Sequence, residues 1–274
     1  MAVKARPIAV PQWVNPILVA NNQISVDAVG HHFDYHETTA AFPVLDSEKG
    51  WLPGVQVTGS AMGNLGTITN VYAMGQFTWI KGTTDYWAAG GPVTSNRDGA
   101  EVKDFDFRLG KGFDVGTSWM FTPYFGAGYH VWDRDLSNQF GPFGYHEKYE
   151  HGYAGAGLLI QWAPSNQLVL SATGLVGSTF DPKMTTSFNG GAAILPWTYG
   201  LGSSVIYKAG VAADYAITRQ WHANVGVDYV NFRYGASAFA PDGTFEPDSR
   251  TSNWTVKAGL GYSFYTAPAV VANY

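Results

Sequence analysis

The sequence contains no cysteine, which excludes disulfide bridges, thiolate metal sites and cysteine nucleophiles. Charged residues make up only 14% of the chain, well below the roughly 25% of ordinary soluble domains. The net charge is -5 and no basic run occurs, which argues against a nucleic-acid-binding protein. A transmembrane helix needs about 20 consecutive, mostly apolar residues, and no stretch of the sequence meets this requirement. The first residues lack the apolar core of a secretory signal, so we expect a mature chain whose leader was removed.

Apolar residues are nevertheless abundant, at 46% of the chain, while the mean hydropathy is only -0.09. Polar residues must therefore be interleaved with the apolar ones rather than separated from them. Aromatic residues reach 15%, and the 274 residues include 33 glycines. Low charge combined with many aromatic residues and glycines is typical of strands that cross a membrane between aromatic girdles.

The clearest element is the last predicted strand, residues 253–264, in which polar and apolar side chains alternate. Its apolar face holds Trp254, Val256, Ala258, Leu260, Tyr262 and Phe264. Its other face holds Thr255, Lys257, Gly259, Gly261 and Ser263. A period of two predicts a β-strand. In a membrane barrel the apolar face contacts lipid and the polar face lines the lumen, whereas in a soluble β-sandwich the apolar face is core.

Ten segments of the chain show this alternation. They cover about residues 23–37, 51–62, 67–83, 101–115, 119–134, 149–162, 167–181, 204–217, 220–234 and 253–264. The connections between them are alternately short turns and long polar loops, as in membrane barrels with an even number of strands. We therefore predict an all-β fold, a transmembrane antiparallel up-and-down β-barrel of ten strands with short periplasmic turns and long extracellular loops. A soluble β-sandwich or barrel is the alternative.

The predicted barrel occupies residues 22–265. Residues 1–21 contain three prolines and no period, which indicates an extended periplasmic segment, and residues 266–274 form a short periplasmic tail. In the first strand Phe33 and Tyr35 break the phase set by Val26 and Ala28, so we expect a β-bulge near Gly30. Three tryptophans beside short turns predict a periplasmic aromatic girdle: Trp119, Trp162 and Trp221.

Four residues of the last strand, Lys257, Gly259, Tyr262 and Phe264, resemble the terminal signal by which bacterial outer-membrane proteins reach their insertion machinery. Through this motif and the strand pattern, the chain resembles the outer-membrane β-barrel superfamily of Gram-negative bacteria. Its first residues also resemble the mature start of small alphaproteobacterial outer-membrane proteins, which are usually eight-stranded. The resemblance implies a place in the bacterial outer membrane and contact with its lipid, its lipopolysaccharide and the insertion machinery, but it implies no activity.

Charged and imidazole side chains gather on the predicted lumen face. They are Asp27, Asp104, Asp106, Arg108, Asp114, His130, Lys208, Asp214, His222, Asp228 and Lys257. Two interpretations are open: an ion pathway or catalytic pocket, or an interior filled by mutually neutralising ion pairs, as narrow barrels require. We favour the filled interior, although four strands without lumenal charge leave room for a narrow wet path.

Hairpin register predicts which of these charges meet. A three-residue turn at residues 217–219 places Lys208 opposite Asp228 and Asp214 opposite His222. The same reasoning on the preceding charged hairpin places Asp104 opposite His130.

A histidine-rich segment ends the first predicted strand, with His31, His32 and His36. Histidines two and four residues apart can share a face and bind a metal, but the segment matches no recognised metal-binding spacing. We therefore assign no metal and no cofactor to it.

An outer-membrane hydrolase is the functional alternative. The pairs Asp104/Asp106 and Asp133/Asp135 resemble one half of the acidic machinery of omptins, the ten-stranded outer-membrane proteases, but no Asp-x-His completes the other half on a late strand. A cluster at 145–151 is more simply explained as the solvated base of a loop. We therefore predict a structural or surface-interaction role, with a narrow pore for small solutes as an extension of it. An omptin-like protease or lipid-modifying enzyme with a site at the extracellular rim remains the rival.

Overall fold

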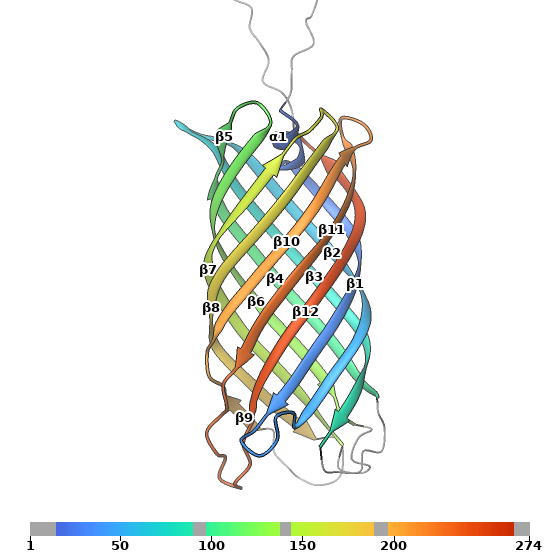
Figure 1. Cartoon of the computed structure of the whole chain (residues 1–274), viewed down its shortest axis with the longest axis vertical. Helices are drawn as coiled ribbons and strands as arrows, with labels where there is room; N and C mark the ends of the chain where they lie inside the picture. Colours follow the sequence, from blue (N-terminus) through green and yellow to red (C-terminus); the bar gives the residue numbers. More distant parts are fainter. Residues whose placement is uncertain (1–14, 90–96, 138–143, 189–196, 266–274) are drawn as a thin grey trace, which may run out of the picture.

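The structure, a computed structural model, describes residues 15–89, 97–137, 144–188 and 197–265. Its elements are α1 (Pro16–Ala20), β1 (Gln23–Thr38), β2 (Asp46–Leu65), β3 (Ile68–Ala88), β4 (Arg97–Lys111), β5 (Phe113–Val115), β6 (Trp119–Asp135), β7 (Tyr145–Trp162), β8 (Leu168–Phe188), β9 (Trp197–Gly200), β10 (Val205–Ala216), β11 (Trp221–Tyr234) and β12 (Asp248–Ser263). Neighbouring strands are antiparallel, and pairing of β1 with β12 and of β8 with β10 closes the sheet. The short β5 and β9 pair only with β6 and β8, so the barrel wall has ten strands (Figure 1).

The two ends of the barrel differ in their connections. Short turns join β2 to β3, β5 to β6, β7 to β8 and β10 to β11 at one end, where α1 also lies (Figure 1). The β2–β3 turn is two residues long, and Gly66 adopts φ 61° in it, a left-handed conformation that favours glycine. The long connections lie at the other end. We call these the short-turn end and the long-loop end.

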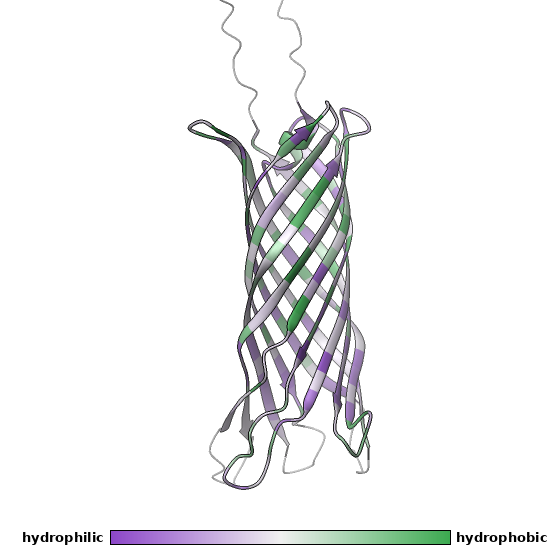
Figure 2. Ribbon diagram, turned by 60° about the vertical axis from the view of Figure 1, so that its left-hand side comes forward, coloured by the Kyte–Doolittle hydropathy of each residue, from purple (hydrophilic) through white to green (hydrophobic). Residues whose placement is uncertain are grey.

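The period of two separates an apolar exterior from a polar interior. Outward side chains in the middle of the strands are apolar and about half exposed, for example Val26, Phe105, Leu109, Val176 and Leu260. Toward the long loops the strands become hydrophilic (Figure 2). This band of exposed apolar residues is the surface that a bilayer would cover.

Most strands are longer than predicted, and they grow toward the long-loop end. For β2 and β3 we predicted residues 51–62 and 67–83, whereas the strands are Asp46–Leu65 and Ile68–Ala88. A strand needs only about 9–11 residues to cross a bilayer. The added residues are polar on the outside and charged or aromatic on the inside, so the barrel wall continues beyond the apolar band.

Three local predictions were wrong. The β1 pairing with β2 runs without a register shift from Gln23 to His36, so there is no bulge at Gly30, and Phe33 and Tyr35 point into the lumen. Residues 16–20 are helical rather than extended. Asp114 is exposed in β5 near the short-turn end, where it accepts a hydrogen bond from Asn70, because the pairing of β4 stops before β5 begins. The predicted tail 266–274 lies outside the described residues.

Within the described part of the chain, no helix has the length and apolar character needed to cross a membrane.

Candidate functional site

The short-turn end of the lumen is occupied by α1. Asn15 caps the helix by accepting a hydrogen bond from the Ile17 backbone N–H at 2.9 Å, and Pro16 begins its first turn. Ile17 is fully buried and belongs to the cluster of buried apolar side chains that fills the barrel interior. After the helix, Asn21 donates to Gln161 Oε1 across the lumen at 2.6 Å. The helix is therefore fixed to opposite walls and covers this mouth.

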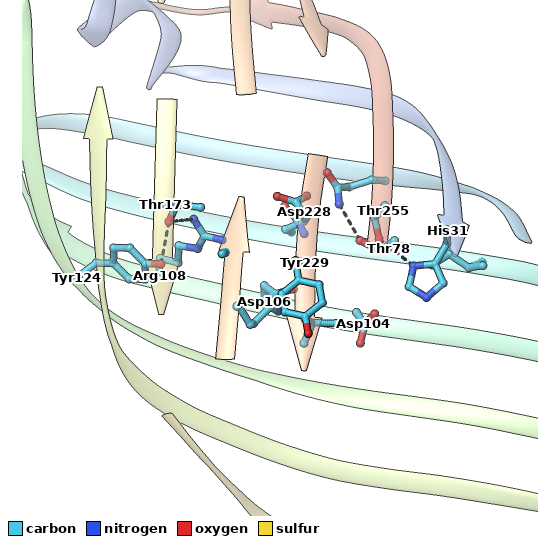
Figure 3. Close-up of a pocket in the computed structure, with 16 residues that line it drawn as sticks. His31, Thr78, Asp104, Asp106, Arg108, Tyr124, Thr173, Asp228, Tyr229 and Thr255 are labelled. Atoms are coloured by element: carbon cyan, nitrogen blue, oxygen red, sulfur yellow. Dashed lines mark hydrogen bonds and ion pairs between the residues drawn. The ribbon is translucent and has the colours of Figure 1, made fainter. Parts of the chain in front are cut away.

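The middle of the lumen holds ion pairs that cross between strands. Lys257 lies 2.6 Å from Asp228, and Lys208 pairs with Asp106. Tyr153 also donates to Asp106, so this carboxylate has two partners. Figure 3 shows Asp106, Asp228 and Arg108 directed toward the same small cavity. Lys208 on β10 thus neutralises a carboxylate across the lumen on β4, whereas Lys257 and Asp228 lie on the neighbouring strands β12 and β11.

Arg108 lines this cavity, and no carboxylate of the described residues lies within ion-pair distance of it. Its Nη1 donates to Thr173 Oγ1 at 3.2 Å, and its guanidinium lies over the Tyr124 ring (Figure 3). Tyr124 itself bonds to Thr173 at 2.9 Å. The arginine therefore bridges β4, β6 and β8 rather than standing free in a channel.

Two histidine–aspartate pairs also lie on the lumen face. His130 Nδ1 is 2.6 Å from Asp104, and His222 Nδ1 is 2.6 Å from Asp214. Such pairs are general acid–base elements in hydrolases when a substrate can reach them. Both histidines are buried, and the two residues of each pair lie on neighbouring strands, β4 and β6 or β10 and β11, so the pairs act as cross-strand contacts in this geometry.

An aromatic layer closes the lumen above His130. Rings from four strands pack with centroid distances of 4.8 Å for Phe33–Trp132, 4.8 Å for Trp132–Tyr149 and 5.8 Å for Tyr149–Tyr234. All four rings are at most 1% exposed. Tyr234 also bonds to His151 at 2.7 Å. Close ring packing of this kind leaves little room for a water column.

Beyond the aromatic layer, Arg134 stands at the centre of a ring of carboxylates. Its guanidinium contacts Glu147 at 2.8 Å, Asp46 at 2.8 Å and Glu37 at 3.3 Å, and it also bonds to Glu48. These residues come from β6, β7, β2 and β1, so one side chain links four strands. The Arg134 side chain is 2% exposed, although it lies near the long loops. We call this group the Arg134 cluster.

The connection between β11 and β12 adds a further carboxylate to the Arg134 cluster. Glu246 is buried and accepts a hydrogen bond from Tyr149 at 2.6 Å. The connection folds on itself, because Ser237 N–H donates to the Glu246 carbonyl at 2.9 Å, and it is tied to Tyr199 through Thr244 at 2.7 Å. The loop thus reaches over the long-loop mouth and inserts its glutamate.

In the described part of the chain the carboxyl groups of the Arg134 cluster outnumber its one cation, and burial changes the pKa of three of them. Burial, followed by repulsion from Asp46, raises the pKa of Glu37 to about 8, although Arg134 opposes the shift. Burial also raises the pKa of Glu48 and of Glu246. With a pKa of about 8, the Glu37 carboxyl is largely protonated near neutral pH, so fewer negative charges face Arg134 than the number of carboxyl groups.

The register prediction for β10 and β11 was wrong by two residues. Gly210 rather than Lys208 lies opposite Asp228, because the connection is longer than predicted and Ile217 N–H bonds to the Trp221 carbonyl. Lys208 therefore pairs across the lumen with Asp106. The predicted Asp214–His222 contact exists, but it is diagonal rather than directly opposed.

The β4–β6 register is as predicted. Asp104 lies opposite His130, and Gly126 and Gly128 lie opposite Arg108 and Asp106. Asp27 also faces the lumen, where Ser25 donates to its carboxylate at 3.3 Å.

The other predicted site residues lie as follows. Trp119, Trp162 and Trp221 are exposed on the outside near the short-turn end, and the first two rings stack at 5.5 Å. In the terminal motif Lys257 and Gly259 face the lumen, whereas Tyr262 and Phe264 face outward.

The histidines of β1 do not converge. His31 points into the lumen and bonds to Thr255 at 2.8 Å, while His32 packs on Trp51 on the outside. Among the described residues no group of three or more histidine or carboxylate side chains is arranged to hold a metal ion.

Sequence reasoning missed the Arg134 cluster because Asp46, Glu48 and Glu147 were assigned to loops, while Glu37 and Arg134 stood at the last positions of two predicted strands. The alternation itself contained the signal. Arg134 follows His130 and Trp132 at intervals of two and therefore lies on the same inward face, and Glu147 shares the inward face of Tyr149 in the same way. The polar character of these segments concealed a period of two that persists beyond the apolar band.

The omptin-like half-motif is divided by the barrel wall. Asp104 and Asp106 face the lumen, whereas Asp133 lies on the outside, where Lys103 approaches it at 3.6 Å. The acidic pairs therefore do not face one cleft.

No known protein family and no curated protein sequence matches the chain. Its structure is similar to that of the outer membrane protease OmpT from Escherichia coli, with a TM-score of 0.54 and 12% identity over 88% of this chain and 95% of that one. The translocator domain of the autotransporter NalP from Neisseria meningitidis is similar over 88% of each chain, with a TM-score of 0.43 and 13% identity. At these identities the likeness concerns the fold alone, which is that of an outer-membrane β-barrel.

Proposed function

We propose that this chain is an integral protein of the bacterial outer membrane whose lumen is closed and whose role is structural or in surface interaction. The observation that carries the proposal is that both ends of the lumen are blocked by folded parts of the chain itself. One block is α1, and the other is the aromatic layer together with the Arg134 cluster.

The orientation follows from the strand connections. Short turns lie on the periplasmic side in barrels of this class, so we infer that α1 lies in the periplasmic mouth and the Arg134 cluster in the extracellular mouth. The last strand, with Lys257, Gly259, Tyr262 and Phe264, then serves as the signal for the insertion machinery. The lipid-facing band and the three tryptophans near the short turns suit this placement.

The contacts inside the lumen favour a scaffold over a pore. A solute passing through would have to separate Lys208 from Asp106 and Lys257 from Asp228, pairs that are at least partly buried. The mutual neutralisation therefore stabilises the narrow barrel at the expense of transport.

Swelling of protein-loaded liposomes in small sugars or amino acids tests this proposal. We expect the swelling rate to equal that of protein-free liposomes, with a general porin in parallel liposomes as the positive control. Solute-dependent swelling that scales with the amount of this protein would show a pore and overturn the closed-scaffold function.

A further inference from the structure

The outer surface just beyond the apolar band carries two groups of charges that differ in their pairing. The first lies on β3, β4, β6 and β7. There Lys81 and Lys103 contact Glu101 at 2.9 and 2.8 Å, and Lys148 contacts Glu150 at 2.8 Å. Each of these three lysines therefore has its carboxylate partner within the protein, and this surface is neutralised internally.

The second group lies on β11, β12 and β1, and it is predominantly cationic. Arg233 is directly opposite Arg250, and Arg250 is directly opposite His36. Both arginines are exposed, and neither has a carboxylate within ion-pair distance in the described part of the chain. The acidic residue nearest along β12, Asp248, instead accepts a hydrogen bond from the Ala236 backbone N–H at 2.9 Å.

Two like charges directly opposite each other destabilise a sheet. Here the repulsion is also sensed by His36, whose pKa is lowered by burial and further by Arg250, Lys49 and Arg233, with Asp34 opposing. Lys49 has its own partner, because it lies 3.4 Å from Asp34. The arrangement costs stability unless an anion from outside the chain lies between the arginines.

The neighbouring rows of side chains fix the height of this pair relative to a membrane. Two rows closer to the apolar band, Tyr229 packs on Trp254 with centroids 4.7 Å apart, as aromatic residues do at a membrane interface. Four residues along a strand span about 13 Å, or about 10 Å of height at a tilt of about 40°. Arginine side chains can extend back toward the interface, so their guanidinium groups reach the level of lipid headgroups rather than of acyl chains.

We propose that Arg233 and Arg250 bind a phosphate group on the headgroup of a phosphorylated glycolipid in the outer leaflet. A guanidinium presents a planar fork of donors that matches phosphate oxygens in a bidentate manner, and two adjacent forks can hold one dianion. The sugars of a glycolipid headgroup carry phosphate away from the acyl chains, to the height at which the arginines lie. The aromatic row below would contact the sugars or the first methylenes. The partner is therefore a lipid, and the site is independent of whether the lumen is closed.

Native mass spectrometry of the detergent-purified protein tests this site with a bisphosphorylated, acylated glucosamine disaccharide as the probe. We expect the double variant R233Q/R250Q to bind the probe about tenfold more weakly than the wild-type protein, or weaker still. The matched control is K81Q/K103Q, which removes two outward cations that already have a carboxylate partner, Glu101. It should bind the probe as the wild-type protein does. Unchanged heat-modifiable gel mobility will show that each variant is folded.

Further arms of the experiment separate phosphate from the rest of the lipid. The dephosphorylated disaccharide should bind the wild-type protein as weakly as the intact probe binds R233Q/R250Q. When the intact probe binds the wild-type protein, the pKa of His36, followed by NMR, should rise. Equal losses in R233Q/R250Q and K81Q/K103Q would overturn the proposal, because the effect would then be one of net charge. Equal binding of the dephosphorylated probe, or equally tight binding of inorganic phosphate alone, would also overturn it.

Discussion

Replacing Arg134 with methionine removes the one cation that the described residues contribute to the Arg134 cluster, while retaining most of the side-chain volume. Four carboxylates contact the guanidinium, and the Arg134 side chain is 2% exposed. Removing one partner of a buried ion pair costs about 3–5 kcal/mol, because the remaining charges are left unpaired in a poor solvent. We expect a loss of that size in the free energy of unfolding near neutral pH.

The loss has an upper limit because carboxyl groups can take up protons. Glu37 already has a pKa of about 8, so near neutral pH it is largely uncharged, and other members of the cluster can follow when Arg134 is gone. The destabilisation of Arg134→Met should therefore shrink at about pH 5, where protonation relieves the repulsion. A purely steric defect would show no such dependence.

Urea titrations of the protein refolded into lipid vesicles, at about pH 5 and about pH 8, provide the assay. Lys81→Met is the matched control, because it removes a cation from an exposed ion pair, which is worth about 0–1 kcal/mol. A loss for Arg134→Met no larger than that of Lys81→Met at both pH values would refute the reasoning.

Two other perturbations test separate parts of the account. Leu109→Arg, at the middle of the lipid-facing band, should lower the free energy of unfolding in vesicles by about 2–4 kcal/mol. Ile68→Arg, beside a short turn, should lower it by only about 0–1 kcal/mol. Equal losses would mean that the apolar band has been assigned to the wrong residues. The Glu37 carboxyl has a folded-state pKa of about 8 against an ordinary 4.5, so the stability it contributes is complete below about pH 4.5 and is lost as the pH rises through about 8. Urea midpoints should therefore fall over that interval and fall less in Glu37→Gln, and identical pH profiles for the two proteins would contradict the assignment.

The faces of the strands were predictable because they depend only on a period of two. Residues such as Leu109 and Ala258 lie outward, and Lys208, Asp228 and Lys257 lie inward, in agreement with the sequence pattern. A slip of two residues in a hairpin preserves both faces, so the pattern cannot specify which residues meet. Lys208 therefore faces the lumen as predicted but pairs with Asp106 instead of Asp228.

The closures of the lumen were not predictable by the same reasoning. The helix α1 has only five residues, too few to show a helical period, and it depends on the Asn15 cap and on burial of Ile17. The Arg134 cluster joins residues 37 and 134 through closure of the barrel, a contact that no local pattern encodes. The alternation places Arg134 on the inward face of the predicted strand 119–134, but it cannot specify which carboxylates Arg134 meets.

The conductance of the purified protein in a planar lipid bilayer tests most directly whether the lumen is closed. With α1 in one mouth and the Arg134 cluster in the other, we predict no steady conductance steps at neutral pH, with insertion verified by protease protection of the same vesicles used for fusion. Arg134→Met should give more frequent transient openings than Lys81→Met. Steady, uniform conductance steps from the wild-type protein would contradict the closed-lumen account.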